Sequence, residues 1–246
     1  MSQIQRIVRS IKMPQLEISY KTRDQAQGRW GGARPGAGRK RRKGGKRKHD
    51  TDHQTRPEHA PRFPVHVTLR VKQDVGRLRR GYVLRRLRRA LHVVAWREDV
   101  FRVVHMSIQN NHLHLLVEAA GKTELARGMQ AFTISAARAI NRAQERTGKV
   151  FAFRYHAVEI KNRRQTRHAL AYVLNNWRRH AEDRRILHVL DEFSSAVVFD
   201  GWTCGRFAVP ARHEPLAVTA AQTWLLREGW KMYGLIAPRE VPGPLG

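Results

Sequence analysis

Two histidines stand one residue apart in the sequence Asn111-His112-Leu113-His114-Leu115. In a β-strand, residues i and i+2 project from the same face, so His112 and His114 would point together while the leucines enter a core. Two imidazoles fixed on one rigid strand form a converging pair of metal ligands. The plainer alternative is that two polar positions of an alternating strand happen to be histidine, and the pair alone does not decide between them.

A tyrosine and an asparagine are the second candidate pair, at Tyr172 and Asn176. On a helix they lie one turn apart and face the same way, in a row that also holds His168 and His180. A tyrosine can act as a covalent nucleophile, and an amide oxygen suits a hard divalent cation. A packed aromatic is the ordinary role of a single tyrosine, and four others compete: Tyr20, Tyr82, Tyr155 and Tyr233.

Tyr172 is the favoured nucleophile because it alone has a potential metal ligand one turn away, on a helix that follows the last predicted strand. Tyr155 is the main rival, but its position in a predicted strand suits a packing role.

The elements that must position these residues follow the order β-α-β-β-α-β-α. Alternating apolar residues predict strands at 65–71, 101–108, 113–117 and 151–160, and Asn110-Asn111 suits a tight turn. Apolar residues at helical spacing predict helices around 84–94 and 125–140, and over 163–181. The first six elements match the split βαβ pattern of the ferredoxin-like fold, an α+β class with one antiparallel sheet and helices on one face.

The rest of the chain divides into an arm and an extension. Residues 1–60 carry 16 Lys and Arg against five acids, and the Gly- and Pro-rich stretch at 31–40 cannot hold a helix. This basic arm is expected to be disordered until it lies on phosphates, or to serve only as a solubilising tail. The ordered domain is expected at 61–182. Residues 183–246 form a C-terminal extension, with a short helix at 223–230 and Thr219 as a candidate cap.

The net charge of +28 and pI near 11.6 indicate a polyanionic partner, with nucleic acid as the default. Ribosomal and chromatin proteins are equally basic, so charge names no activity. The single cysteine, Cys204, excludes an internal disulfide and a cysteine-based zinc cluster, and no apolar stretch predicts a membrane span or a secretory signal. The residues expected to bind DNA are Arg34, Arg39, Lys40, Arg41, Arg42, Lys43, Arg79, Arg80, Arg85, Arg86, Arg89, Arg178 and Arg179.

Taken together, Asn-His-Leu-His at 111–114 and Tyr-x-x-x-Asn at 172–176 resemble the HUH-type single-tyrosine transposases of insertion sequences. The resemblance covers about residues 63–180 and is strongest to the REP-associated branch of this IS200-like family. It departs in one place, since Trp177 follows Asn176 where that branch commonly has proline.

This resemblance implies a DNA transposase that nicks and rejoins single-stranded DNA beside small hairpins. His112, His114 and Asn176 would hold Mg²⁺ or Mn²⁺, and Tyr172 would form a 5′-phosphotyrosine. It also implies a bacterial, cytoplasmic, nucleoid-associated protein, with a homodimer as one expected state. Two alternatives remain open, a non-catalytic domesticated nucleic-acid-binding protein and a replication-initiator-type nickase. The recognised hairpin and the role of residues 183–246 cannot be read from the sequence.

Overall fold

In the computed structural model, which describes residues 57–182, 189–209 and 213–243, four antiparallel strands form one sheet. The strands are β1 (Val65–Arg70), β2 (Phe101–Ile108), β3 (His112–Ala119) and β4 (His156–Glu159). Their order across the sheet is β2-β3-β1-β4, which is the strand order of the ferredoxin-like fold. The predicted α+β class and sheet are therefore confirmed.

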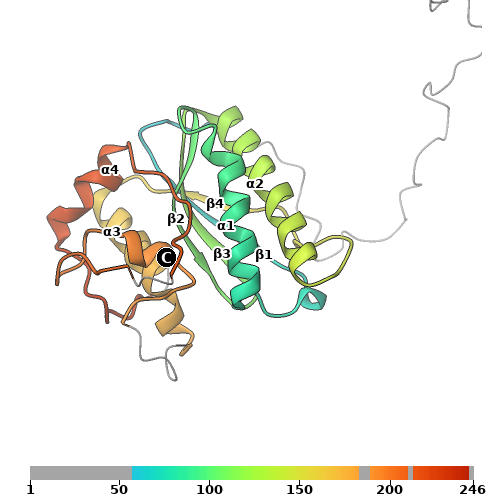
Figure 1. Ribbon diagram of the computed structural model, residues 1–246. Coiled ribbons are helices and arrows are strands. Elements are labelled where there is room, and N and C mark those ends of the chain that lie inside the picture. The colour runs from blue at the N-terminus through green and yellow to red at the C-terminus, as the bar shows by residue number, and fades with distance from the viewer. Residues whose placement is uncertain (1–56, 183–188, 210–212, 244–246) are drawn as a thin grey trace, which may run out of the picture. The chain divides into compact units, whose positions relative to one another are not determined.

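Two helices, α1 (Gly81–Ala95) and α2 (Lys122–Ala143), cover one face of this sheet (Figure 1). Every second residue of the strands, such as Val67 and Leu115, points into the core beneath them. The predicted stripe of α2 is fully or almost fully buried, and at Gly128 the helix approaches so closely that an added Cβ would lie 2.1 Å from the Phe101 ring. A larger residue there would overpack the core.

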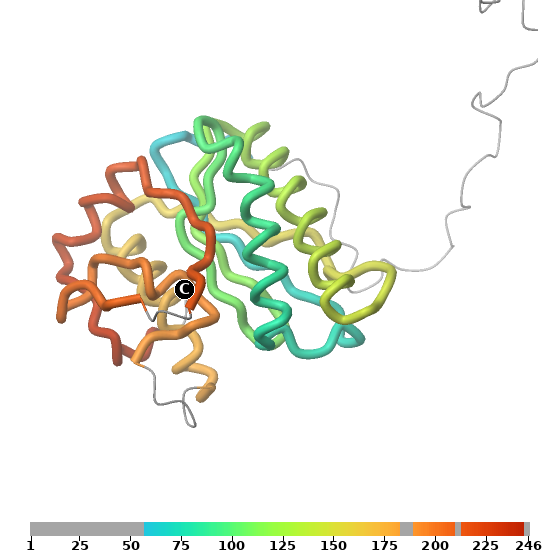
Figure 2. Tube along the Cα trace, in the orientation of Figure 1, coloured from blue at the N-terminus to red at the C-terminus, as the bar shows by residue number. Residues whose placement is uncertain are grey.

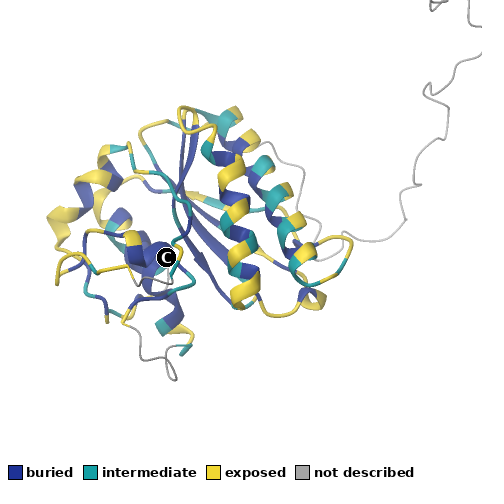
Figure 3. Cartoon of the chain, in the orientation of Figure 1, coloured by how far each residue is buried: buried dark blue, intermediate teal, exposed yellow. Residues whose placement is uncertain are grey.

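The third helix, α3 (Arg163–Arg179), lies on the opposite face of the sheet (Figure 1). The prediction of helices on one face therefore holds for α1 and α2 but not for α3. The second core that α3 builds contains Leu170, Leu174, Trp202 and Trp230. Both faces of the sheet are consequently covered, and β1, β2 and β3 are buried along almost their whole length, whereas the edge strand β4 is exposed at every second residue (Figure 3).

Several C-terminal elements pack against α3 (Figure 2), while the segment 216–223 runs beside β2 and β3. The elements that pack against α3 include the turn η2 (Ser195–Val198), the short helix α4 (Trp224–Arg227) and the turn η3 (Gly229–Tyr233). Arg167 pairs with Glu240 at 2.8 Å, and Asn175 Nδ2 donates to the carbonyl oxygen of Ala237. These bonds hold α3 against the sheet from outside.

Three local predictions need correction. The strand expected over 151–160 is shorter, because between the Val71–Phe151 bridge and β4 the backbone leaves β1 and Phe153 is exposed despite its apolar character. Thr223 caps α4 through its Oγ1, and Thr219 does not cap it. The apolar stripe of the helix predicted around 84–94 is expected to begin with Leu84, but in α1 Val83 is fully buried and Leu84 only partly.

Most of the predicted basic arm, with its residues Arg34, Arg39, Lys40, Arg41, Arg42 and Lys43, lies outside the described residues. Within the described ranges, no helix combines the length and apolar character that a membrane crossing requires.

Candidate active site

A cleft of about 940 Å³ lies between the sheet and α3, on the face opposite α1 and α2. The register of β1 and β3 pairs Thr68 with His114 and Arg70 with His112, so these four side chains share one face. Helix α3 closes the cleft from the other side. Its most polar lining residues are His66, Thr68, Arg70, His112, His114, His156, Glu159, Gln165, His168, Tyr172, Arg179 and His180.

The two histidines predicted as ligands converge in this cleft. The Nε2 atoms of His112 and His114 lie 2.8 Å apart, and their rings are nearly perpendicular. Two nitrogens bound at right angles to one ion at about 2.1 Å would be about 3.0 Å apart, so this separation suits a shared cation. His112 Nδ1 lies 2.7 Å from Asn111 Oδ1 and donates to it, which leaves the Nε2 lone pair of His112 free.

His114 is supported from β1 through its other nitrogen. Its Nδ1 lies 3.1 Å from His66 Nε2 and 3.2 Å from Thr68 Oγ1, and the His66 ring stacks on the His114 ring. An imidazole and a hydroxyl can each donate or accept, so both tautomers of His114 find a partner. When Nδ1 carries the proton, the Nε2 lone pair of His114 is available to a metal, the usual arrangement at metal-binding histidines.

The electrostatic surroundings keep this pair neutral. Burial, with smaller effects of His180 and Arg70, lowers the pKa of His112 to about 4. Burial also lowers the pKa of His114 to about 2, with smaller effects of His112, His66 and His180. A neutral imidazole is the form that binds metal, so both histidines are competent ligands at neutral pH.

Tyr172 reaches the same cleft from α3. Its ring centroid lies 5.1 Å from that of His114 and 5.9 Å from that of His66, nearly perpendicular to both. The guanidinium carbon of Arg179 lies 6.0 Å from the Tyr172 ring centroid. The structure therefore brings the predicted nucleophile and the histidine pair together within one chain.

The competing tyrosines lie elsewhere. Tyr155 is partly buried against the core beneath α1 and α2, as its predicted packing role requires. Tyr82 and Tyr233 are about half exposed, on α1 and η3, and neither lines the cleft. Tyr20 lies outside the described residues.

Asn176 follows Tyr172 by one helical turn and precedes His180, and both of those residues line the cleft. Its side chain is completely buried, and neither its amide nitrogen nor its amide oxygen has a hydrogen-bond partner in the described part of the chain. No three His, Cys, Asp or Glu side chains among the described residues come together as a metal-binding group. The Asn176 amide, unpaired within the described ranges, is a candidate third ligand of another type.

The basic residues predicted to bind DNA divide into three groups. The side chain of Arg79 is almost fully buried, and its guanidinium pairs with Asp191 and Glu182. Arg178 donates to the carbonyl oxygens of Pro238 and Val189 and so fastens the C-terminal segment. Among those of the predicted residues that the structure describes, only Arg179 lines the cleft.

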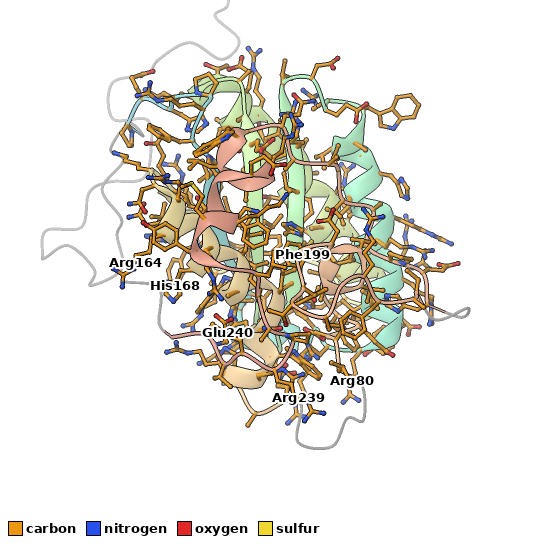
Figure 4. All side chains as sticks on the ribbon, turned by 90° about the vertical axis from the view of Figure 1, so that its left-hand side faces the viewer. Arg80, Arg164, His168, Phe199, Arg239 and Glu240 are labelled. Atoms are coloured by element: carbon orange, nitrogen blue, oxygen red, sulfur yellow. The ribbon has the colours of Figure 1, made fainter. Side chains whose placement is uncertain are left out.

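Of the remaining four, Arg85, Arg86 and Arg89 are on α1, across the sheet from the cleft. Arg80 precedes α1 and lies far from His168 in a view toward α3 (Figure 4).

Thr68 and Arg70 are among the cleft residues that were not singled out from the sequence. A signal for them was present: the alternation of β1 puts His66, Thr68 and Arg70 on one polar face. The ferredoxin-like strand order then places that face beside β3, which carries the histidine pair.

The fold and the cleft together define a ferredoxin-like protein in which a helix presents a tyrosine to a pair of histidines on a central strand. Residues 60–176 match the family described as "Transposase IS200 like". A search of curated proteins found no match.

Two solved structures are similar to the chain. One is a REP-associated tyrosine transposase bound to a REP hairpin, 16% identical, with a TM-score of 0.40, covering 53% of this chain and 74% of its own. The other is a protein from Deinococcus radiodurans R1 described as a transposase, 16% identical, with a TM-score of 0.34, covering 49% of this chain and 89% of its own.

Proposed function

We propose that this chain is an IS200-like transposase that cuts and rejoins single-stranded DNA, with Tyr172 as the nucleophile. The observation that carries the proposal is the position of the Tyr172 ring against His114 in the cleft of the same chain. The family match supports a DNA substrate, and the net charge of +28 supports a polyanionic one. We further propose that the substrate strand carries a hairpin next to the cleavage position.

The residues that would hold a divalent cation are His112, His114 and Asn176. Mg²⁺ or Mn²⁺ bound there would supply Lewis-acid polarisation of a phosphoryl oxygen. Two observations support the assignment: the Nε2 atoms of the histidines converge, and the buried Asn176 amide has no hydrogen-bond partner among the residues that the structure describes.

The protein's own groups account for the covalent step. The Tyr172 hydroxyl oxygen loses its proton and forms a bond to phosphorus, while the bond from phosphorus to the 3′ oxygen breaks and that oxygen takes up a proton. The products are a 5′-phosphotyrosine and a free 3′-hydroxyl. Because the phosphodiester is exchanged for another phosphoester, attack by a 3′-hydroxyl on the phosphotyrosine rejoins the strand without ATP.

Arg179 is an arginine of α3 that lines the cleft beside Tyr172. It is exposed at the cleft and near the Tyr172 ring, and it forms no ion pair within the described ranges. We assign it to holding the phosphate next to the attacking oxygen, because a guanidinium can donate two parallel hydrogen bonds to phosphate oxygens. We place the reaction at nucleoid DNA in a bacterial cytoplasm, with a homodimer as a proposed state.

The test is incubation of the full chain with hairpin-bearing single-stranded oligonucleotides and Mn²⁺, followed by denaturing electrophoresis. We expect a covalent adduct between the protein and the new 5′ end of the DNA at the nick, and this adduct should disappear with EDTA and in Tyr172→Phe. Tyr155→Phe is the matched control and should retain the adduct. Absence of an adduct with all hairpins tried, or an adduct that persists in Tyr172→Phe, contradicts the proposal.

A second candidate, a non-catalytic nucleic-acid-binding protein, is favoured by the same net charge. It predicts binding that falls steeply with salt and is indifferent to chelator and to His112→Ala. Cleavage that is abolished by EDTA would count against it.

A further inference from the structure

A groove of about 1270 Å³ adjoins the cleft and continues away from Tyr172. Arg70, His112 and His180 line both hollows, so the two form one continuous path across the sheet. The path is open at the surface, since Arg70 and His180 are exposed. A strand of DNA whose scissile phosphate lies in the cleft would therefore have a channel ready for its next nucleotides.

The charges along the groove are suited to phosphates. Of its two acids, Asp74 pairs with Lys72 and Arg146, and Glu182 pairs with Arg79. Arg70 and Arg77 also line it and have no ion pair among the described residues. The acids of the groove are thus already neutralised by the protein, while two guanidinium groups remain available to a ligand.

An aromatic side chain lies beside the first of these arginines. The backbone N–H of Ala152 donates to the carbonyl oxygen of Arg70 at 2.9 Å. Phe153 comes directly after Ala152 in the sequence. Phe153 lines the groove and is 51% exposed. Two strand spacings, about 10 Å, separate the backbone at His112 from the backbone at Ala152, with Arg70 between them.

We propose that the unpaired DNA strand leaving the catalytic cleft lies in this groove. Arg70 holds the phosphate next to the scissile one, Arg77 holds a later phosphate, and a base stacks on Phe153. Aromatic stacking together with a cationic track is the general way in which proteins hold single strands without reading base edges. The proposal rests on the proposed function for the position of the scissile phosphate.

The experiment uses the full chain with Tyr172→Phe, so that cleavage does not interfere with binding. Hairpin oligonucleotides carry 2-aminopurine at one unpaired position at a time, and its fluorescence reports stacking at that position. At one labelled position, we expect the fluorescence of the bound oligonucleotide to differ between the Phe153→Ala variant and its parent. The Phe153→Trp variant should give the fluorescence of the parent at that position. Phe153→Ala should also weaken binding about 5- to 100-fold.

Arg70→Ala and Arg77→Ala are expected to reduce the slope of log affinity against log salt by about 0.7 each. Tyr233→Ala, whose side chain is also 51% exposed but lies outside the groove, and Arg138→Ala on α2 are the matched controls and should change neither readout.

The two proposals can fail separately. If Tyr172 forms the adduct but no 2-aminopurine position responds to Phe153→Ala, the groove assignment is overturned and the catalytic one stands. If a position responds although the wild-type chain forms no adduct, the groove assignment stands and the catalytic one fails. Equal effects of Arg138→Ala and Arg70→Ala on the slope of log affinity against log salt would also overturn the groove assignment.

Discussion

Replacing Asn176 by leucine should make the metal-free protein more stable and the metal-bound protein less so. The amide of Asn176 is fully buried and has no hydrogen-bond partner in the described part of the chain. A buried polar group left in that state costs about 1–3 kcal/mol. Leucine has a similar volume and no polar atoms, so we expect Asn176→Leu to raise the free energy of unfolding in EDTA by about 1–2 kcal/mol.

The same substitution removes the proposed third ligand. An ion that binds only the folded state adds about 2.7 kcal/mol of stability at a concentration of 100 times its Kd. The wild type should gain this amount from Mn²⁺, whereas Asn176→Leu should gain much less because its affinity for Mn²⁺ is lower. The two proteins are therefore expected to exchange their order of stability between EDTA and excess Mn²⁺.

The measurement is urea unfolding of both proteins in EDTA and at increasing Mn²⁺, with Asn175→Leu as the matched control. Asn175, the residue before Asn176 on α3, is also buried, but its Nδ2 donates to the carbonyl oxygen of Ala237. Its replacement should therefore destabilise the protein in both conditions. A loss of stability in EDTA for Asn176→Leu would mean that its amide is satisfied. Full stabilisation of that variant by Mn²⁺ would remove Asn176 from the ligand set.

Three further outcomes are expected. Thr68→Val combined with His66→Phe removes both partners of His114 Nδ1 and should weaken Mn²⁺ binding about 10- to 100-fold. Electron paramagnetic resonance measures this binding, and an unchanged affinity would show that neither residue orients His114. An equimolar mixture of Tyr172→Phe and His112→Ala should form no adduct, because the tyrosine and the histidines meet within one chain; recovered adduct would indicate a shared site between chains. Burial lowers the pKa of His105 to about 4, so the unfolded chain takes up this proton first, and His105 alone should contribute about 1–2 kcal/mol to the loss of stability between pH 7 and pH 5. The other buried histidines add to this loss, so His105→Gln should reduce it in urea unfolding without abolishing it; an unchanged slope would argue against this role.

The sequence predicts much of this fold because its elements have clear periodicity. The α2 stripe from Leu125 to Ile140 is apolar at helical spacing, and the strand over 101–108 has the bounds that its composition indicates. The Asn110-Asn111 turn joins β2 to β3, and this local connection already limits how the histidine strand can pair.

Other features depend on contacts that periodicity does not contain. Phe153 is apolar and belongs to a segment whose composition predicts a strand. It nevertheless lies at the surface, because the backbone there has left β1. The arginines of α1 form a basic cluster in the sequence, yet only the packing of α1 and α3 on opposite faces separates that cluster from the cleft. Arg70 stands out only once its cross-strand neighbour is known to be His112.

The position of the proposed nucleophile depends on residues far from it in the chain. On the inner side of helix α3, Tyr172 lines the cleft. On the outer side of the helix, the segment 235–240 is bound by Arg167, Asn175 and Arg178. A helix held on both sides cannot leave the sheet of its own chain without breaking these bonds, which include the Arg167–Glu240 pair. Exchange of α3 between two chains would require that same segment to move with it. The C-terminal segment is therefore a reason to expect each chain to use its own tyrosine, whether or not two chains associate.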